Sequence, residues 1–167
     1  MANKQSFKPE EWTKILESTM LAGMAVSAAE PSGLWGALKE AFASSSALAA
    51  AKTSAGSSEL VKAVVADFET KEGRAAVKEA LRQHLAGTTK PAEAVQRSLA
   101  NLREVSAILN AKAPQDASAF KAWLQTISQN VAAASSEGGF LGIGGVQVSD
   151  AEKATLADIS KALGTQT

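Results

Sequence analysis

Residues 9–29, PEEWTKILESTMLAGMAVSAA, begin as an amphipathic helix and continue as an apolar one. Pro9 suits the first helical position, and the two glutamates after it complement the positive end of the helix dipole. Apolar side chains then recur at steps of three and four residues, and after Met20 the polar face disappears. We therefore expect a helix that enters the protein, becomes surrounded by its neighbours, and ends before Pro31.

Similar apolar stripes predict further helices on the C-terminal side of this one. Ser149 and Glu152 have the spacing of a capping box, and Gly164 marks the end of the last helix. Alternation typical of strands is almost absent. The expected fold is an all-α, alanine-rich, single-domain bundle of six or seven helices over residues 1–167. The helices after the first are expected from about 32 into the 40s, around 60–68, from about 70 to 85, 91–110, from 114 into the 130s, and 149–163.

The composition limits the classes of function. Alanine accounts for 35 of the 167 residues, so the helices pack closely around a small set of large side chains. The 17 basic and 17 acidic residues balance, which argues against a general nucleic-acid clamp. Cysteine is absent, which excludes disulfides and thiolate metal sites. We find no targeting segment and no apolar run long enough to span a membrane, and we expect a cytoplasmic protein.

Two segments lack a regular helical pattern. Residues 44–58 are rich in serine and alanine and are predicted to form a flexible connection. Residues 137–148 form a glycine-rich apolar loop without the Lys and Ser or Thr of a phosphate-binding loop. Its large side chains fit two interpretations, a plug folded over the core or a docking element for a partner. These side chains are Phe140, Leu141 and Ile143.

A second set of candidates consists of large side chains within the apolar stripes. Core packing is one interpretation, and a cavity between helices for an apolar small molecule is the other. The composition of the stripes is compatible with both. The residues concerned are Trp12, Met20, Met24, Trp35 and Trp123.

Residues that would carry chemistry are few. His84 is the only histidine, lies on the apolar side of its helix, and is expected to have a structural or surface role. Arg74, Lys78, Arg82 and Lys90 are expected to form a solvated face, and a modest patch for an anionic partner is the alternative. Glu93 and Arg97 have the spacing to pair one turn apart. No metal-ligand spacing, nucleophile motif or cofactor fingerprint occurs, so we expect no catalytic residue, no metal and no cofactor.

The C-terminal segment GGVQVSDAEKATLADISKALG, residues 144–164, resembles the terminal portion of tellurite-resistance TerB-like helical domains. Residues 25–40, AVSAAEPSGLWGALKE, resemble the same turn less closely. In that family an acidic turn is linked to metal binding. Here Gly144 and Gly145 stand where an Asp-Gly pair would be needed, which argues against metal transfer. The resemblance implies a compact bacterial helical domain connected with stress response or protein assembly.

Together these observations predict a small, non-catalytic helical protein that acts as a protein-interaction or stress-associated module. Its partner would be an unidentified protein or a second copy of the chain. The alternative hypothesis is a carrier or sensor of an apolar small molecule bound between the helices.

Overall fold

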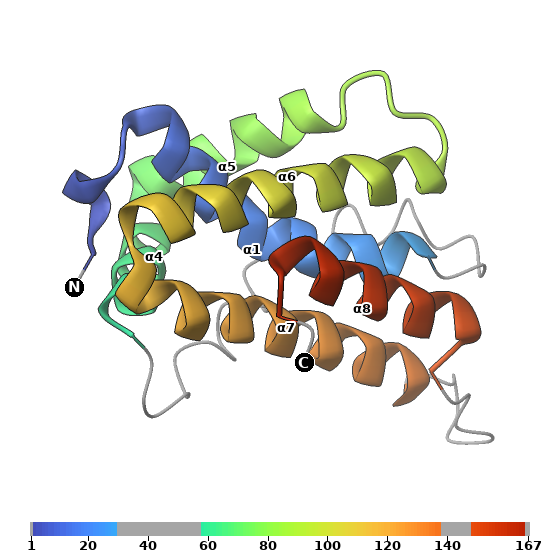
Figure 1. Cartoon of the computed structure of the whole chain (residues 1–167). Coiled ribbons are helices and arrows are strands. Elements are labelled where there is room, and N and C mark those ends of the chain that lie inside the picture. The colour runs from blue at the N-terminus through green and yellow to red at the C-terminus, as the bar shows by residue number, and fades with distance from the viewer. Residues whose placement is uncertain (1, 30–57, 138–147, 166–167) are drawn as a thin grey trace.

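A computed structural model describes residues 2–29, 58–137 and 148–165 of the chain, and the side chains of 134–137 are not part of that description (Figure 1). Of the described residues, 86% are helical and none lies in a strand. The prediction of an all-α single-domain bundle is therefore confirmed.

Six α-helices lie within the described residues, and a short 3-10 turn, η1 (Lys4–Ser6), precedes them. Their limits agree closely with the predicted ones, because the prolines at 9, 91 and 114 each begin a helix as expected. The helices are α1 (Pro9–Ala29), α4 (Glu59–Glu69), α5 (Lys71–His84), α6 (Pro91–Lys112), α7 (Pro114–Glu137) and α8 (Asp150–Leu163).

Local capping explains where several helices begin and end. The Thr70 hydroxyl accepts a hydrogen bond from the backbone N–H of Gly73 at 2.9 Å, so Thr70 caps the start of α5. Ser149 and Glu152 form the expected capping box at the start of α8. Gly164 ends α8 with φ = 67°, a left-handed conformation that glycine adopts without steric cost.

The junction between α4 and α5 depends on the absence of a side chain at position 73. A Cβ placed on Gly73 would lie 2.0 Å from the backbone carbonyl oxygen of Asp67, far inside van der Waals contact. Any larger residue would therefore push α5 away from the end of α4.

Helix α1 runs through the middle of the bundle and contacts each of the other five described helices (Figure 1). Every residue from Ile15 to Ala28 is buried, including Glu17. The prediction that this helix becomes surrounded by its neighbours is thus confirmed. The single core that results contains large side chains from all six helices.

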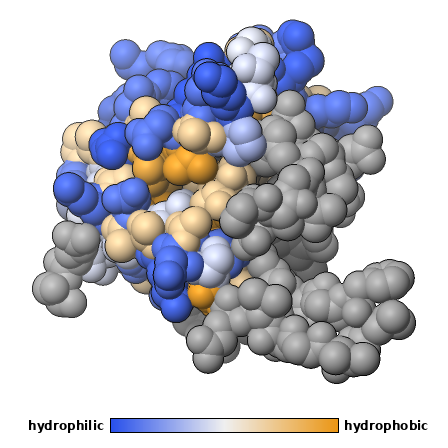
Figure 2. Space-filling model, turned by 90° about the vertical axis from the view of Figure 1, so that its right-hand side faces the viewer, coloured by the Kyte–Doolittle hydropathy of each residue, from blue (hydrophilic) through white to orange (hydrophobic). Residues whose placement is uncertain are grey.

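Helices α6, α7 and α8 cover much of α1 (Figure 1). Between α7 and the core, the rings of Phe120 and Trp123 meet edge to face with centroids 5.3 Å apart. Figure 2 shows the end of the molecule where α6 and α8 begin, and a group of hydrophobic residues is visible there among hydrophilic ones. Val95 of α6 and Leu156 of α8 are half-buried against the core.

Three predicted segments lie outside the described residues. These are the helix expected from about residue 32 into the 40s, the connection 44–58 except Ser58, and the glycine-rich loop 137–148 except its two end residues.

Candidate functional site

The clearest cluster of polar groups in the described interior joins three helices. Glu17 of α1 accepts a hydrogen bond at its Oε2 from the Nδ2 of Asn101 in α6, at 3.1 Å. His84, the last residue of α5, places its Nδ1 3.3 Å from Oε1 of the same carboxyl group. These two atoms are not aligned for a hydrogen bond. The carboxyl group of Glu17 therefore lies between an amide and an imidazole.

Burial shifts the pKa values of the two titratable groups in this cluster. Only 5% of Glu17 and 6% of Asn101 is exposed to solvent. Removing water from a carboxylate disfavours its charged form, and this burial raises the pKa of Glu17 from its ordinary value of 4.5 to about 7. Burial also lowers the pKa of His84 below its usual value, and the nearby charge of Arg97 adds to that effect.

Charged residues surround the cluster on its solvent side. Lys14 of α1 forms an ion pair with Glu104 of α6. Lys14 favours the ionised form of Glu17, and Glu104 opposes it. Arg97 of α6 donates hydrogen bonds to the backbone carbonyls of His84 and Ala86, at 2.8 and 3.0 Å, and so ties the end of α5 to α6.

The chemistry available to the cluster is the uptake and release of a proton near neutral pH. Unpartnered buried atoms remain on all three side chains, namely Oε1 of Glu17, Nε2 of His84 and Oδ1 of Asn101. A metal would need more ligands than the two titratable groups here. Among the described residues, no three His, Asp or Glu side chains come close enough together to hold an ion.

The predicted binding residues fall into two groups. Phe140, Leu141, Ile143 and Trp35 lie outside the described residues. The other members of the proposed cavity are buried together in one hydrophobic core cluster, in which they contact protein side chains. They are Trp12, Met20, Met24 and Trp123.

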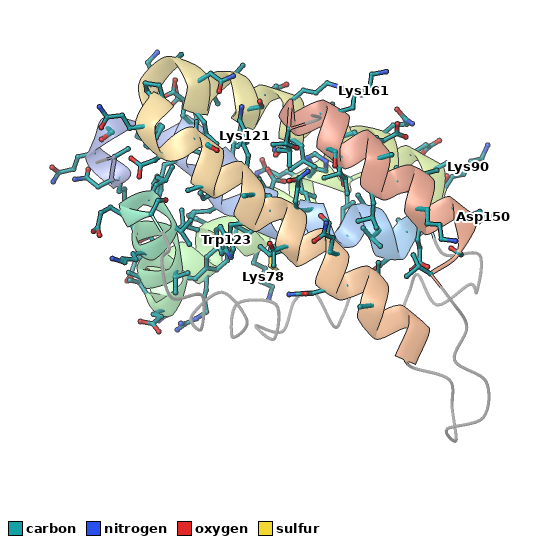
Figure 3. The ribbon with its side chains drawn as sticks, turned by 60° about the horizontal axis from the view of Figure 1, so that its bottom comes forward. Lys78, Lys90, Lys121, Trp123, Asp150 and Lys161 are labelled. Atoms are coloured by element: carbon teal, nitrogen blue, oxygen red, sulfur yellow. The ribbon has the colours of Figure 1, made fainter. Side chains whose placement is uncertain are left out.

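The basic residues from 74 to 90 do not act as one patch in the described structure. Arg74 donates to the carbonyls of Phe68 and Glu69 at the end of α4, and Arg82 pairs with Glu79. Lys78 and Lys90 are exposed and lie far apart along the bundle (Figure 3). Arg97 is used differently from the expected pairing with Glu93, because its guanidinium caps α5 instead.

The sequence placed His84 on the apolar side of its helix but gave no partner for it. Glu17 and Asn101 were not among the predicted site residues. One signal could have identified Glu17, since it is the only charged residue between Ile15 and Ala29 in a stretch expected to be surrounded. Its contact with His84 depends on how α1 and α5 pack.

Comparison of the chain with protein families, with curated proteins and with solved structures found no match. The resemblance of residues 144–164 to TerB-like domains stays a prediction. None of the described helices combines the length and the apolar character that a membrane span requires.

Proposed function

We propose that this protein is a non-catalytic interaction module that binds a partner protein through the outer face of α7. The observation that carries the proposal is the absence of charge on this face. Between Pro114 and Ala133 the helix has only two charged residues, Asp116 and Lys121, and both are buried.

Each of these two charges has a partner inside the protein. Asp116 accepts a hydrogen bond from the backbone N–H of Ala2 at 2.8 Å, and Lys121 donates to Oδ1 of Asn110 at 2.7 Å. Burial lowers the pKa of Lys121. In Figure 3 the side chains of Lys121 and Trp123 leave α7 on opposite sides. Both charges therefore serve internal contacts.

The outer face of α7 carries small and neutral side chains. Its exposed residues recur at steps of three and four, so they share one face of the helix. The buried core of a protein–protein interface is depleted in charged residues. The distance between two packed helices depends on the side chains at their contact, so small side chains on this face would let a partner helix approach closely. The exposed face of α5 is densely charged by comparison. The α7 residues are Ser118, Ala119, Ala122, Thr126, Gln129 and Asn130.

The polar cluster around Glu17 supports the non-catalytic part of the proposal. A general acid or base has to reach a substrate within hydrogen-bond distance. Glu17 is almost fully buried, and both Nδ1 and Nε2 of His84 are directed into the protein, where Nε2 is shielded from solvent.

The test compares two matched double variants of the full chain. Ala119→Glu with Ala122→Glu adds charge to the outer face of α7, and Ala100→Glu with Ala107→Glu adds the same charge to exposed positions of α6. Sedimentation equilibrium measures self-association, and a photo-cross-linking residue in place of Thr126, an exposed residue of the same face, captures other partners in cells. We expect the α7 variant to lose self-association or partner capture, whichever the unmodified protein shows, and the α6 variant to keep it. Equal behaviour of the two variants would contradict the proposal.

A further inference from the structure

The last turn of α5 is held to the bundle by two half-buried leucines, Leu81 and Leu85, and by polar contacts. Only Gly73 and Val77 of this helix are buried, and both lie before its last two turns. Toward its end, α5 relies on half-buried Leu81 and His84, and on the hydrogen bonds from Arg97 to the carbonyls that follow. A helix end with so few buried apolar contacts is a region that opens at low free-energy cost.

The imidazole of His84 covers the carboxyl group of Glu17. The side chain of His84 is 17% exposed and that of Glu17 is 7% exposed, so the histidine is the more accessible of the two. Glu17 receives a single hydrogen bond, from Asn101. A buried carboxylate needs several hydrogen bonds or a close cation to remain charged, and one amide donor is too few.

The charged residues around Glu17 and His84 do not provide the close cation that an ionised Glu17 would need. They are Lys14 of α1 and Arg97 and Glu104 of α6, and Lys14 is already paired with Glu104. Arg97 directs its hydrogen bonds to backbone carbonyls. Burial raises the pKa of Glu17 to about 7 and lowers that of His84, so it favours the neutral form of both groups.

We propose that Glu17, His84 and Asn101 form a proton-binding site that is protonated in the closed structure, and that loss of this proton releases the end of α5 from α1. The protein is thereby a sensor of proton concentration. This inference is independent of the contact face on α7.

The negative charge that Glu17 acquires is what would release the end of α5. The hydrogen bonds around Glu17 can be made in both of its protonation states. A neutral imidazole can accept the O–H of a protonated Glu17 at Nδ1, or donate Nδ1–H to an ionised one. Asn101 can donate to Oε2 in both states. The ionised carboxylate, however, needs water, and displacement of His84 is the shortest structural change that admits it.

Histidine NMR provides the first test, because His84 is the only histidine of the full chain. We expect the imidazole carbon signal of the unmodified protein to show two inflections, its own at a pH below the usual histidine value and one near 7 from Glu17. Glu17→Gln should leave one inflection. Two inflections in the variant would overturn the proposal, because the second titration would then belong to another group.

Hydrogen exchange provides the second test and reports the release itself. After correction for the intrinsic exchange rate, protection of the amides in 81–88 should fall at least tenfold between pH about 5 and 7 and then level off, while protection in 120–128 of α7 stays constant. Glu17→Gln should abolish the fall. Equal falls in both segments would indicate global unfolding and contradict the proposal, as would the same fall in the variant.

His84→Gln is a second variant that keeps the test informative if Glu17→Gln fails to fold. It retains a side-chain hydrogen-bonding group at position 84 and keeps the buried carboxyl group, so the fall in protection of 81–88 should persist. Constant protection in this variant across the same pH range would overturn the proposal.

Discussion

Asp67 and Glu17 are two of the carboxyl groups that connect α1 to its neighbours, and they are satisfied in different ways. Asp67 of α4 accepts a hydrogen bond from Nε1 of Trp12 at 2.7 Å, and Nζ of Lys4 lies 3.1 and 3.0 Å from its two oxygens. Glu17 accepts one hydrogen bond, from Asn101, and its other oxygen has none. Asp67 therefore meets a cation and an indole, whereas Glu17 meets an amide and a neutral imidazole.

The comparison shows that the hydrogen-bond donors around each carboxyl group differ, and these donors determine how well its charged form is stabilised. Lys4 and Trp12 both present N–H donors to Asp67, so this carboxyl group has a charged and a neutral partner. The carboxyl group of Glu17 lacks a directly bonded cation, and its burial raises its pKa. Both groups join helices, and in our proposal a proton controls the link through Glu17.

The largest expected effect comes from Glu17→Gln. The folded protein holds a proton on Glu17 up to about pH 7, whereas the unfolded chain releases it near 4.5. The free energy of unfolding should therefore fall as pH rises between these values, by up to about 3 kcal/mol. Glutamine removes this loss. Urea unfolding at several pH values should show the variant gaining stability relative to the unmodified protein as pH rises.

The difference between the two proteins isolates this effect from other titrations. The lowered pKa of His84 acts in the opposite direction, since the unfolded chain binds more protons there below about 6.5, and stability from this source is lost as pH falls. Carboxyl groups such as Glu79, whose pKa is lowered by Arg82, titrate in both proteins. A stability difference that does not change with pH would show that Glu17 is ionised throughout.

Asp67→Ala should have the next largest effect, a loss of about 2 kcal/mol, because it leaves Nε1 of Trp12 without its acceptor. Asp67→Asn is the matched control, since it keeps an acceptor oxygen and removes the charge that attracts Lys4. Its loss should be roughly half as large. Urea unfolding followed by circular dichroism measures both. Equal losses in the two variants would show that the attraction of Lys4, and not the indole hydrogen bond, holds this end of α1.

Much of the fold could be predicted because its determinants are local. Pro9, the capping box at Ser149 and the left-handed Gly164 each specify a helix end from a few neighbouring residues, and the structure confirms all three. The central position of α1 was also predictable, since its apolar surface continues around the helix.

The site could not be predicted in the same way, because its members come from three helices. The pattern of residues around His84 gives its helical face but contains no information about which part of α1 lies opposite. Arg97 illustrates the same limit: a partner one turn away was expected, and the structure places its guanidinium on carbonyls at the end of α5 instead. Helix packing decides both contacts.

The smallest expected effect concerns Glu152, another buried carboxyl group, which is 2% exposed. Like Glu17, it has one hydrogen-bonded oxygen and one unpartnered oxygen, but it lies in the first turn of α8, where the helix dipole favours negative charge. Ser149→Ala removes the hydroxyl that caps the N–H of Glu152 and should cost about 1 kcal/mol in the free energy of unfolding. Ser118→Ala, at an exposed position within α7, is the control and should change stability little. If the two serine variants are equally stable, the hydroxyl cap contributes little, and the hydrogen bond from the backbone N–H of Ser149 to Glu152 is sufficient to fix the start of α8.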